Sequence, residues 1–234
     1  MLTDSSEVIG RPGPVLYTCE HASNRVPRPV RLRPADRRLL GLHWGYDIGA
    51  ANLTRGLARR GPGLAVLARW SRLLLDANRT PDDASAVLRD THDGKPTFNT
   101  AVDLDARIAR FHAPFHATID TTLTRHRPRW IWSIHTYTPT FNGVVRPMEA
   151  GVLYDAHDGV CAELRAAMCR RGLRTELNEP YSGKAGLIYS ANRHGTRHGL
   201  PYLEIEVRQD LVASRRAAER VAALVLAAQH DVGF

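Results

Sequence analysis

The stretch Trp-Ile-Trp-Ser-Ile-His at residues 130–135 predicts a buried β-strand that ends in a polar side chain. A short apolar run of this length is typical of a strand inside a sheet. The preceding segment, residues 104–125, has the spacing of an amphipathic helix, because its large apolar residues fall on one stripe: Ile108, Phe111, Phe115, Ile119 and Leu123. A helix that leads into a buried strand indicates an α/β protein.

The same alternation continues on both sides of this unit. We predict strands at residues 15–18, 64–67, 71–76, 151–154 and 200–207, and helices at residues 47–60, 159–171 and 211–229. Residues 80–100 are rich in Asp, Pro, Gly and Thr, which predicts a surface loop that carries or covers a site. This order favours an α/β sandwich with a mostly parallel or mixed sheet. No linker or repeat interrupts it, so we expect one domain over residues 1–234.

The amino-acid composition limits the classes of protein to which this chain can belong. The chain has 234 residues, of which 43% are hydrophobic and 24% charged, which is typical of a globular protein with one sizeable core. No apolar run approaches the roughly 18 residues that a membrane span needs. The first ten residues, MLTDSSEVIG, lack the basic segment and the apolar run of a secretion signal. We therefore expect a cytoplasmic protein with no membrane partner.

The cysteines limit the kind of metal site that this chain can build. Cys19, Cys161 and Cys169 are the only three, and no CxxC pair is present. So sparse a set predicts neither a disulfide framework nor a thiolate zinc site. Any metal ion would be held by imidazole and carboxylate groups, which suit zinc or a similar first-row ion.

The net charge of +8 raises nucleic-acid binding as an alternative function. The arginines are spread along the chain, however, and no lysine-rich tail or repeated basic-aromatic motif is present. A small anionic substrate would be served by the same positive field. We expect no nucleic-acid partner, and the alternative predicts binding that weakens steeply with salt.

Four predicted strands end in groups that carry chemistry. These groups are Glu20 with His21, the segment Asp76–Arg79, His135, and Glu204 with Glu206. In an open α/β sheet, ligands bind beyond the carboxyl ends of the strands. Activation of water by a divalent metal ion needs two or three nitrogen or oxygen ligands, an open position and a carboxylate that takes the proton. The sequence predicts such a site at this edge of the sheet.

Other catalytic signatures are missing from the sequence. There is no GxGxxG after a strand, no GxxxxGK[ST] phosphate loop, no GxSxG nucleophile turn and no HExxH. Ser23 and Ser133 lie near the predicted site without a nucleophile turn, so a serine hydrolase ranks below a metal-water mechanism. Histidines predicted in loops or on polar helix faces receive no role, and His43 is interpreted as a structural neighbour; the former are His92, His126, His157, His194 and His230.

Five strings of sequence together resemble the N-formylglutamate amidohydrolase family. They are CEHASNRVP at 19–27, DIGA at 47–50, SR and DANR within 71–79, HTYTP at 135–139 and EIEVRQDL at 204–211. The resemblance implies a fold related to that of the zinc carboxypeptidases and aspartoacylases. This fold is a three-layer α/β/α sandwich of the phosphorylase/hydrolase-like type, with a mixed, mostly parallel sheet. It also implies hydrolysis of an N-acyl amide by water that one divalent metal ion activates, with Zn²⁺ as the first choice. In the reaction that names the family, the products are formate and glutamate.

The resemblance also suggests metal ligands. His21 and His135, at the ends of two strands, look like two of them. Carboxypeptidase-like sites take a carboxylate three residues after the first histidine, but here that position is Asn24. The remaining ligand therefore stays open between Asp47, which matches an acidic position of the family, and Glu20 as the reserve.

Glu206 looks like the carboxylate that accepts the proton of the water and passes it to the leaving nitrogen. Glu204 shares its side-chain parity on the strand and is the alternative base. Asn78 and Arg79 resemble the pair with which related enzymes grip a substrate carboxylate, because a guanidinium fork matches a carboxylate and Asn adds a donor. Arg146 is the best further candidate.

The weaker candidates for substrate contact are Arg72, Arg208 and His116. His116 resembles a histidine of the family and lies one helical turn beyond His112, so it is interpreted as a substrate contact or a neighbour of the site. The predicted partner is a small anionic N-acyl amino acid, and the chain is expected to be a monomer or a small homo-oligomer. An N-acyl amino acid deacylase or a peptidase on the same metal site remains the alternative.

Overall fold

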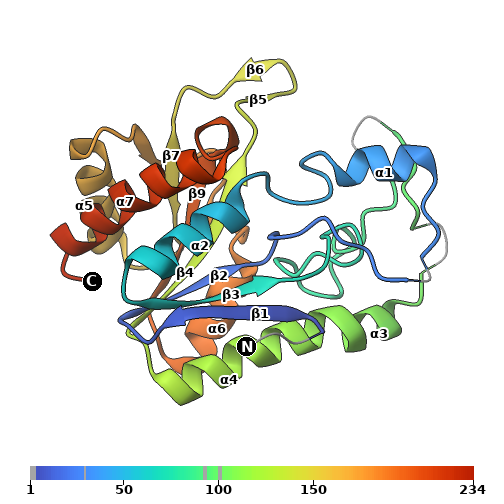
Figure 1. The fold of residues 1–234 in the computed structure, drawn as a ribbon, viewed down its shortest axis with the longest axis horizontal. Helices are drawn as coiled ribbons and strands as arrows, with labels where there is room; N and C mark the ends of the chain where they lie inside the picture. Colours follow the sequence, from blue (N-terminus) through green and yellow to red (C-terminus); the bar gives the residue numbers. More distant parts are fainter. Residues whose placement is uncertain (1–3, 29, 92–93, 100–101) are drawn as a thin grey trace.

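A computed structural model of the chain describes residues 4–28, 30–91, 94–99 and 102–234. Its centre is a seven-stranded sheet in the order β1-β3-β2-β4-β9-β7-β8, with helices on both faces (Figure 1). This is the predicted three-layer α/β/α sandwich with a mixed, mostly parallel sheet.

The middle of the sheet is parallel and its edges are antiparallel to it. Strands β2 (Val15–Cys19), β3 (Gly63–Ala68), β4 (Trp130–Tyr137) and β9 (Tyr202–Arg208) run in one direction. On one edge β1 (Ser6–Arg11) pairs with β3 in the opposite direction. On the other edge β7 (Ala150–Leu153) is antiparallel to β9 and parallel to β8 (Thr175–Leu177). The carboxyl ends of the four parallel strands therefore meet on one side of the molecule.

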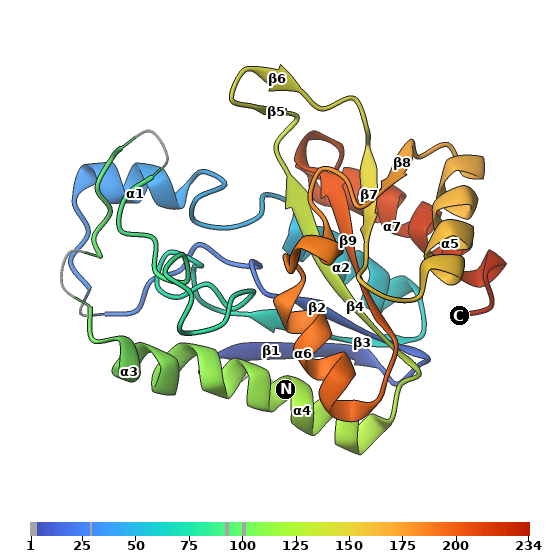
Figure 2. The same ribbon diagram turned by 180° about the vertical axis from the view of Figure 1, so that it is seen from behind.

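Different helices cover the two faces of the sheet. One face is packed by α2 (Ala50–Arg60), α5 (Asp158–Arg170) and α7 (Arg215–Asp231), which contribute to the largest apolar cluster. The other face is packed by α4 (Ala113–His126) and α6 (Tyr189–His198); in Figure 2, α6 lies in front of the strands and α4 runs along the bottom of the view. The predicted helix over residues 104–125 is divided into α3 (Leu104–Arg107), a π-helical turn (Ile108–His112) and α4.

Side-chain alternation in the central strands explains where the site lies. In β4, Trp132 and Ile134 enter the core under α2 and α7, while Ile131 enters the core under α4 and α6. Ser133 and His135 share the face of Ile131, because side chains alternate along a strand. Both polar residues are buried, so this face changes from apolar to polar toward the carboxyl end of the strand.

The strand predicted at residues 71–76 is wrong, since this segment forms turns after β3. Its leucines are buried in small apolar clusters outside the main sheet. Leu73 packs with Leu39 and Leu40 of α1 (Pro34–Leu40), and Leu75 packs with Ala86 and Val87. A run of leucines therefore indicated burial here, but not a place in the sheet.

Several other elements were not predicted or begin elsewhere. The edge strands β1 and β8, helix α6 and the short hairpin of β5 (Thr140–Phe141) and β6 (Val144–Val145) were missed. Two short 3₁₀ turns cover Gly183–Ala185 and Gln209–Leu211. The helix expected from residue 47 begins at Ala50, because Gly49 adopts a φ of +90° with its backbone against Val212. This turn leaves Asp47 free to face the sheet edge.

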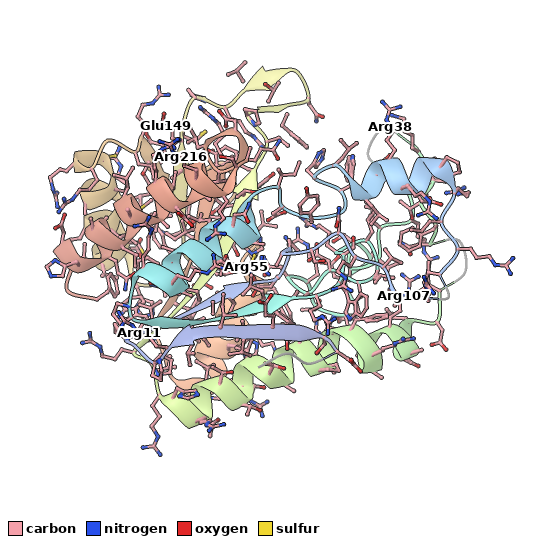
Figure 3. The ribbon with its side chains drawn as sticks, in the orientation of Figure 1. Arg11, Arg38, Arg55, Arg107, Glu149 and Arg216 are labelled. Atoms are coloured by element: carbon pink, nitrogen blue, oxygen red, sulfur yellow. The ribbon has the colours of Figure 1, made fainter. Side chains whose placement is uncertain are left out.

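Within the part of the chain that the structure describes, no helix has the length and apolarity to cross a membrane. The labelled arginines in Figure 3 lie on β1, α1, α2, α3 and α7, well separated over the molecule.

Candidate active site

The predicted groups converge at the carboxyl ends of β2, β4 and β9. A pocket of about 170 Å³ opens there. Its lining includes nine residues that were considered individually from sequence and also several aromatic side chains. The lining consists of His21, His43, Asp47, Arg72, Asn78, Arg79, His135, Thr136, Tyr137, Thr138, Phe141, Tyr181, Leu187, Glu204 and Glu206. The polar clusters that follow separate strands in the sequence thus line one cavity.

His21, Asp47 and His135 form a compact cluster of donor atoms in this pocket. Oδ2 of Asp47 lies 2.8 Å from Nδ1 of His135 and 3.3 Å from Nδ1 of His21. One ligand atom from each residue lies within 4.8 Å of the others, and all three residues are buried. Two imidazoles and a carboxylate in this arrangement are a ligand set that zinc accepts, with room for a further ligand.

A second carboxylate fixes the other side of His21. Oδ1 of Asp76 lies 2.6 Å from Nε2 of His21, and Oδ2 of Asp76 accepts from Nη2 of Arg72 at 2.6 Å. Arg72 also donates from Nη1 to Oδ1 of Asp47 at 3.2 Å. Histidines that ligate metal ions commonly place their other ring nitrogen against a carboxylate, which fixes the ring's orientation.

His135 is held in the same way by Glu20. Nε2 of His135 lies 3.1 Å from Oε2 of Glu20 and 2.9 Å from Oγ of Ser133, which itself donates to Glu20 at 2.7 Å. Glu20 therefore faces the ring nitrogen that points away from Asp47. Asn24, the position where carboxypeptidase-like sites have a carboxylate, is exposed.

The two glutamates of β9 lie on the same face of the sheet as His135, which is paired with Glu206 in the register of β4 and β9. Oε2 of Glu204 accepts from Nδ2 of Asn78 at 3.1 Å. Oε2 of Glu206 is buried and has no hydrogen-bond partner among the described residues. Burial raises the pKa of Glu206 well above its usual range; His135 opposes this shift and Glu204 adds to it.

The cluster as a whole carries an excess of negative groups. Five carboxylates are buried here, namely Glu20, Asp47, Asp76, Glu204 and Glu206, while Arg72 is the guanidinium bonded to them. Burial disfavours the charged ring of His135, but the charge of Glu204 and the hydrogen bonds with Asp47 and Glu20 raise its pKa well above the ordinary value. The arrangement therefore favours positive charge at this point, as a divalent cation would supply.

The guanidinium of Arg79 is positioned to bind an anion. It lines the pocket, and no hydrogen bond or ion pair joins it to another side chain within the described ranges. Asn78 also lines the pocket, but its amide is largely engaged, because Nδ2 donates to Glu204 and Oδ1 accepts from the backbone N–H of Ser190 at 2.9 Å. Arg79 is thus the available partner for a substrate carboxylate.

Arg146 and His116 do not line the pocket. The guanidinium of Arg146 lies over the rings of Tyr137, Phe141 and Tyr181, with its carbon 4.8 Å from the centroid of Phe141. These cation–π contacts hold together three aromatic side chains that line the pocket. His116 is buried, and its Nε2 lies 3.1 Å from the carbonyl oxygen of Ala77. It contacts the backbone of the loop that carries Asn78 and Arg79.

Sequence reasoning missed parts of this site. Asp76 stood in a recognised string but received no role, although it holds His21. Tyr181 comes from a loop that has no periodic signal, and His43, interpreted as a structural neighbour, lines the pocket. The prediction that His194 lies in a loop or on a polar helix face was wrong, since its side chain is 0% exposed and belongs to α6. His92 lies outside the described residues.

Comparison with known proteins agrees with this geometry. The sequence profile of the N-formylglutamate amidohydrolase family matches residues 13–213. The crystal structure of gene product Atu2144 from Agrobacterium tumefaciens has a TM-score of 0.86 at 26% identity and covers 98% of this chain and 96% of that one. The crystal structure of N-formylglutamate amidohydrolase from Ralstonia eutropha JMP134 has a TM-score of 0.77 at 16% identity, with 98% and 97% covered, and shows the shared fold.

No curated protein sequence matches this chain. The family match extends over most of the chain and includes His21, His135 and Glu206. The chain belongs to the N-formylglutamate amidohydrolase family and is a hydrolase that acts on amides.

Proposed function

We propose that this protein is a metal-dependent amidohydrolase that cleaves an N-formyl or other N-acyl amino acid, such as N-formylglutamate, to a carboxylic acid and the free amino acid. The observation that carries the proposal is the convergence of Nδ1 of His21 and Nδ1 of His135 on Oδ2 of Asp47, beside Oε2 of Glu206, which has no hydrogen-bond partner among the described residues. This combines a cation site and a proton acceptor in one pocket.

His21, Asp47 and His135 are the proposed ligands of one divalent ion, with Zn²⁺ as the first choice because the donors are two imidazoles and a carboxylate. Asp47 is preferred over Glu20, because Asp47 faces Nδ1 of both rings whereas Glu20 faces Nε2 of His135. When bound, such an ion polarises the amide carbonyl and lowers the pKa of a water molecule. Asp76 and Glu20 fix the orientation of the two rings.

Glu206 is the proposed general base and acid. Its raised pKa makes the carboxylate a stronger base than an exposed glutamate, which suits a group that takes a proton and then returns it. Oε2 accepts the proton of the attacking water as the water oxygen bonds to the acyl carbon. The same oxygen then delivers this proton to the amide nitrogen as the C–N bond breaks, which releases the acid and the amine.

Arg79 is proposed to bind the carboxylate of the amino acid part of the substrate, with a remaining N–H of Asn78 as a second donor. Tyr137, Phe141 and Tyr181 add aromatic side chains to the lining of the pocket. Such a lining limits the size of the bound acyl amino acid and keeps water away from the reacting bond.

Rates measured in parallel on several substrates test the proposal. We expect measurable release of formate from N-formylglutamate, a sharp fall with N-acetylglutamate if the pocket selects the formyl group, and little activity on an N-formyl amine that lacks a carboxylate. Faster cleavage of N-acetyl amino acids or short peptides would assign a different acyl specificity on the same site. Hydrolysis that ignores the substrate carboxylate would contradict the role of Arg79.

A further inference from the structure

A second group of histidines and a carboxylate lies between α4 and α6, away from the pocket lining. Oδ1 of Asp120 is 2.8 Å from Nδ1 of His194 and 2.8 Å from Nε2 of His198. One ligand atom from each of the three residues lies within 4.8 Å of the others. His194 and His198 are one helical turn apart on α6, so both rings reach the same point beside α4.

The hydrogen-bond chain that leads inward from this cluster determines which ring nitrogens carry hydrogen. Nε2 of His116 faces the carbonyl oxygen of Ala77, which only accepts, so this nitrogen must carry hydrogen. Nδ1 of a neutral His116 is then an acceptor, and it lies 2.8 Å from Nε2 of His194. Nε2 of His194 must therefore donate.

This assignment leaves a conflict at the outer end of the chain. A neutral His194 that donates from Nε2 has a bare Nδ1, yet that nitrogen lies 2.8 Å from the carboxylate oxygen of Asp120. If a neutral His194 carried its hydrogen on Nδ1 instead, its Nε2 would be bare. This nitrogen and Nδ1 of His116 would then face each other as two acceptors. An additional positive charge, either a proton or a metal ion, is needed between these groups.

A metal ion meets this need better than a proton. His194 is 0% exposed, and burial disfavours a charged imidazolium. A divalent ion leaves the ring neutral and accepts the lone pairs of Nδ1 of His194, Nε2 of His198 and Oδ1 of Asp120 together. The side chains of His198 and Asp120 are 19% and 22% exposed, so water can complete the coordination.

We propose that Asp120, His194 and His198 form a second metal site of the zinc type, separate from the one assigned to His21, Asp47 and His135. The positive charge of Arg197 lowers the affinity of this site for a cation. Nε of Arg197 lies 3.7 Å from Oδ2 of Asp120, the oxygen that the proposed ion does not use. The inference does not depend on the proposed enzymatic function.

The site would act on the active-site loop through His116. A metal ion on Nδ1 of His194 fixes hydrogen on its Nε2, which in turn keeps His116 donating to the carbonyl of Ala77. Ala77 directly precedes Asn78, whose amide holds Glu204. Zinc at the outer site would therefore stabilise the loop that carries Asn78 and Arg79 without touching substrate.

Equilibrium dialysis of the metal-free full-length protein against Zn²⁺ tests the site. In a His21→Ala/His135→Ala background, we expect one bound ion per chain, and adding His198→Ala should weaken that binding by at least about 10–100-fold, the loss seen on removing even an outer-shell partner. His230→Ala, which removes an exposed histidine of α7, is the matched control and should leave binding unchanged.

Two results would overturn the proposal: no zinc bound in the double variant while circular dichroism shows that it is folded, or equal binding with and without His198. If the double variant does not fold, the wild-type protein and His198→Ala are compared directly. The proposal then requires that the zinc content differ by one ion per chain, and equal content would overturn it. Loss of zinc from the first site alone leaves this difference intact and bears only on the proposed function.

Discussion

His21 and His135 meet edge to face at the end of two parallel strands, with ring centroids 4.6 Å apart and an interplanar angle of 76°. Each ring turns Nδ1 toward Asp47 and Nε2 toward another carboxylate, Asp76 for His21 and Glu20 for His135. Asp76 and Glu20 thus fix the orientation of the two imidazoles through their Nε2 atoms, so that both Nδ1 atoms face Asp47.

This geometry predicts which substitutions remove a bound metal ion. His21→Ala, His135→Ala and Asp47→Asn should each lose most of the metal, because each removes one of three proposed ligands. Glu20→Gln should weaken metal binding less, by about 10–100-fold at most, since Glu20 orients His135 through Nε2 and is not itself a proposed ligand. Elemental analysis of the purified variants measures this, with His230→Ala as the control. Metal retained in Asp47→Asn and lost in Glu20→Gln would reverse the assignment of the third ligand.

Glu206→Gln should lower kcat by about 100- to 10,000-fold, the range for removal of a general acid-base group. KM and metal content should change little, because the amide keeps the size of the side chain and Glu206 is not a proposed ligand. Glu204→Gln is the matched control: its oxygen accepts from Asn78 and is not free. If Glu204→Gln loses the larger factor in kcat, the base has been assigned to the wrong carboxylate.

Arg79→Ala should raise KM for a carboxylate substrate, since a hydrogen bond to a charged group contributes about 1.5–3 kcal/mol, or roughly 10- to 150-fold. Lysine at this position should recover only part of the loss, because an ammonium group lacks the bidentate fork. Steady-state kinetics on N-formylglutamate measure both values. An unchanged KM in Arg79→Ala would show that another group holds the carboxylate.

His112 predicts a dependence of stability on pH. It is 4% exposed and its Nε2 faces the carbonyl oxygen of Arg79 at 3.1 Å, and burial lowers its pKa below 6.5. The unfolded chain binds a proton at this ring below about pH 6.5, while the folded chain does so only at lower pH. The free energy of unfolding should therefore fall as the pH drops through this value.

His112→Gln keeps an N–H donor for Arg79 but does not titrate. Its free energy of unfolding in urea should decline less steeply than that of the wild type between about pH 7 and 5. Parallel declines in the two proteins would mean that the folded state protonates His112 as readily as the unfolded chain.

The central parallel strands and the edge that carries the site were predictable, because residues 15–18, 64–67, 130–135 and 200–207 are mostly apolar runs with polar groups toward or just after their ends. The edge strand β1 was not predictable, since it is only partly buried and its sequence, SEVIGR, mixes polar and apolar residues. Helix α6 was missed for the same reason: its sequence, YSANRHGTRH, is largely polar although it packs on the sheet.

Site contacts that depend on tertiary packing also escaped prediction. The pairing of His21 with Asp76 requires the loop after β3 to turn back, and that turn is set by leucines that pack outside the sheet. The chain of His116, His194 and Asp120 joins two helices that are distant in sequence. No local pattern records either arrangement.

The most direct test of the central claim is formate release from N-formylglutamate by protein stripped of metal with a chelator and then supplied with Zn²⁺. The account predicts that removal abolishes turnover and that zinc restores it in wild-type protein but not in His21→Ala or His135→Ala. Turnover that continues at an unchanged rate after complete removal of metal would contradict it.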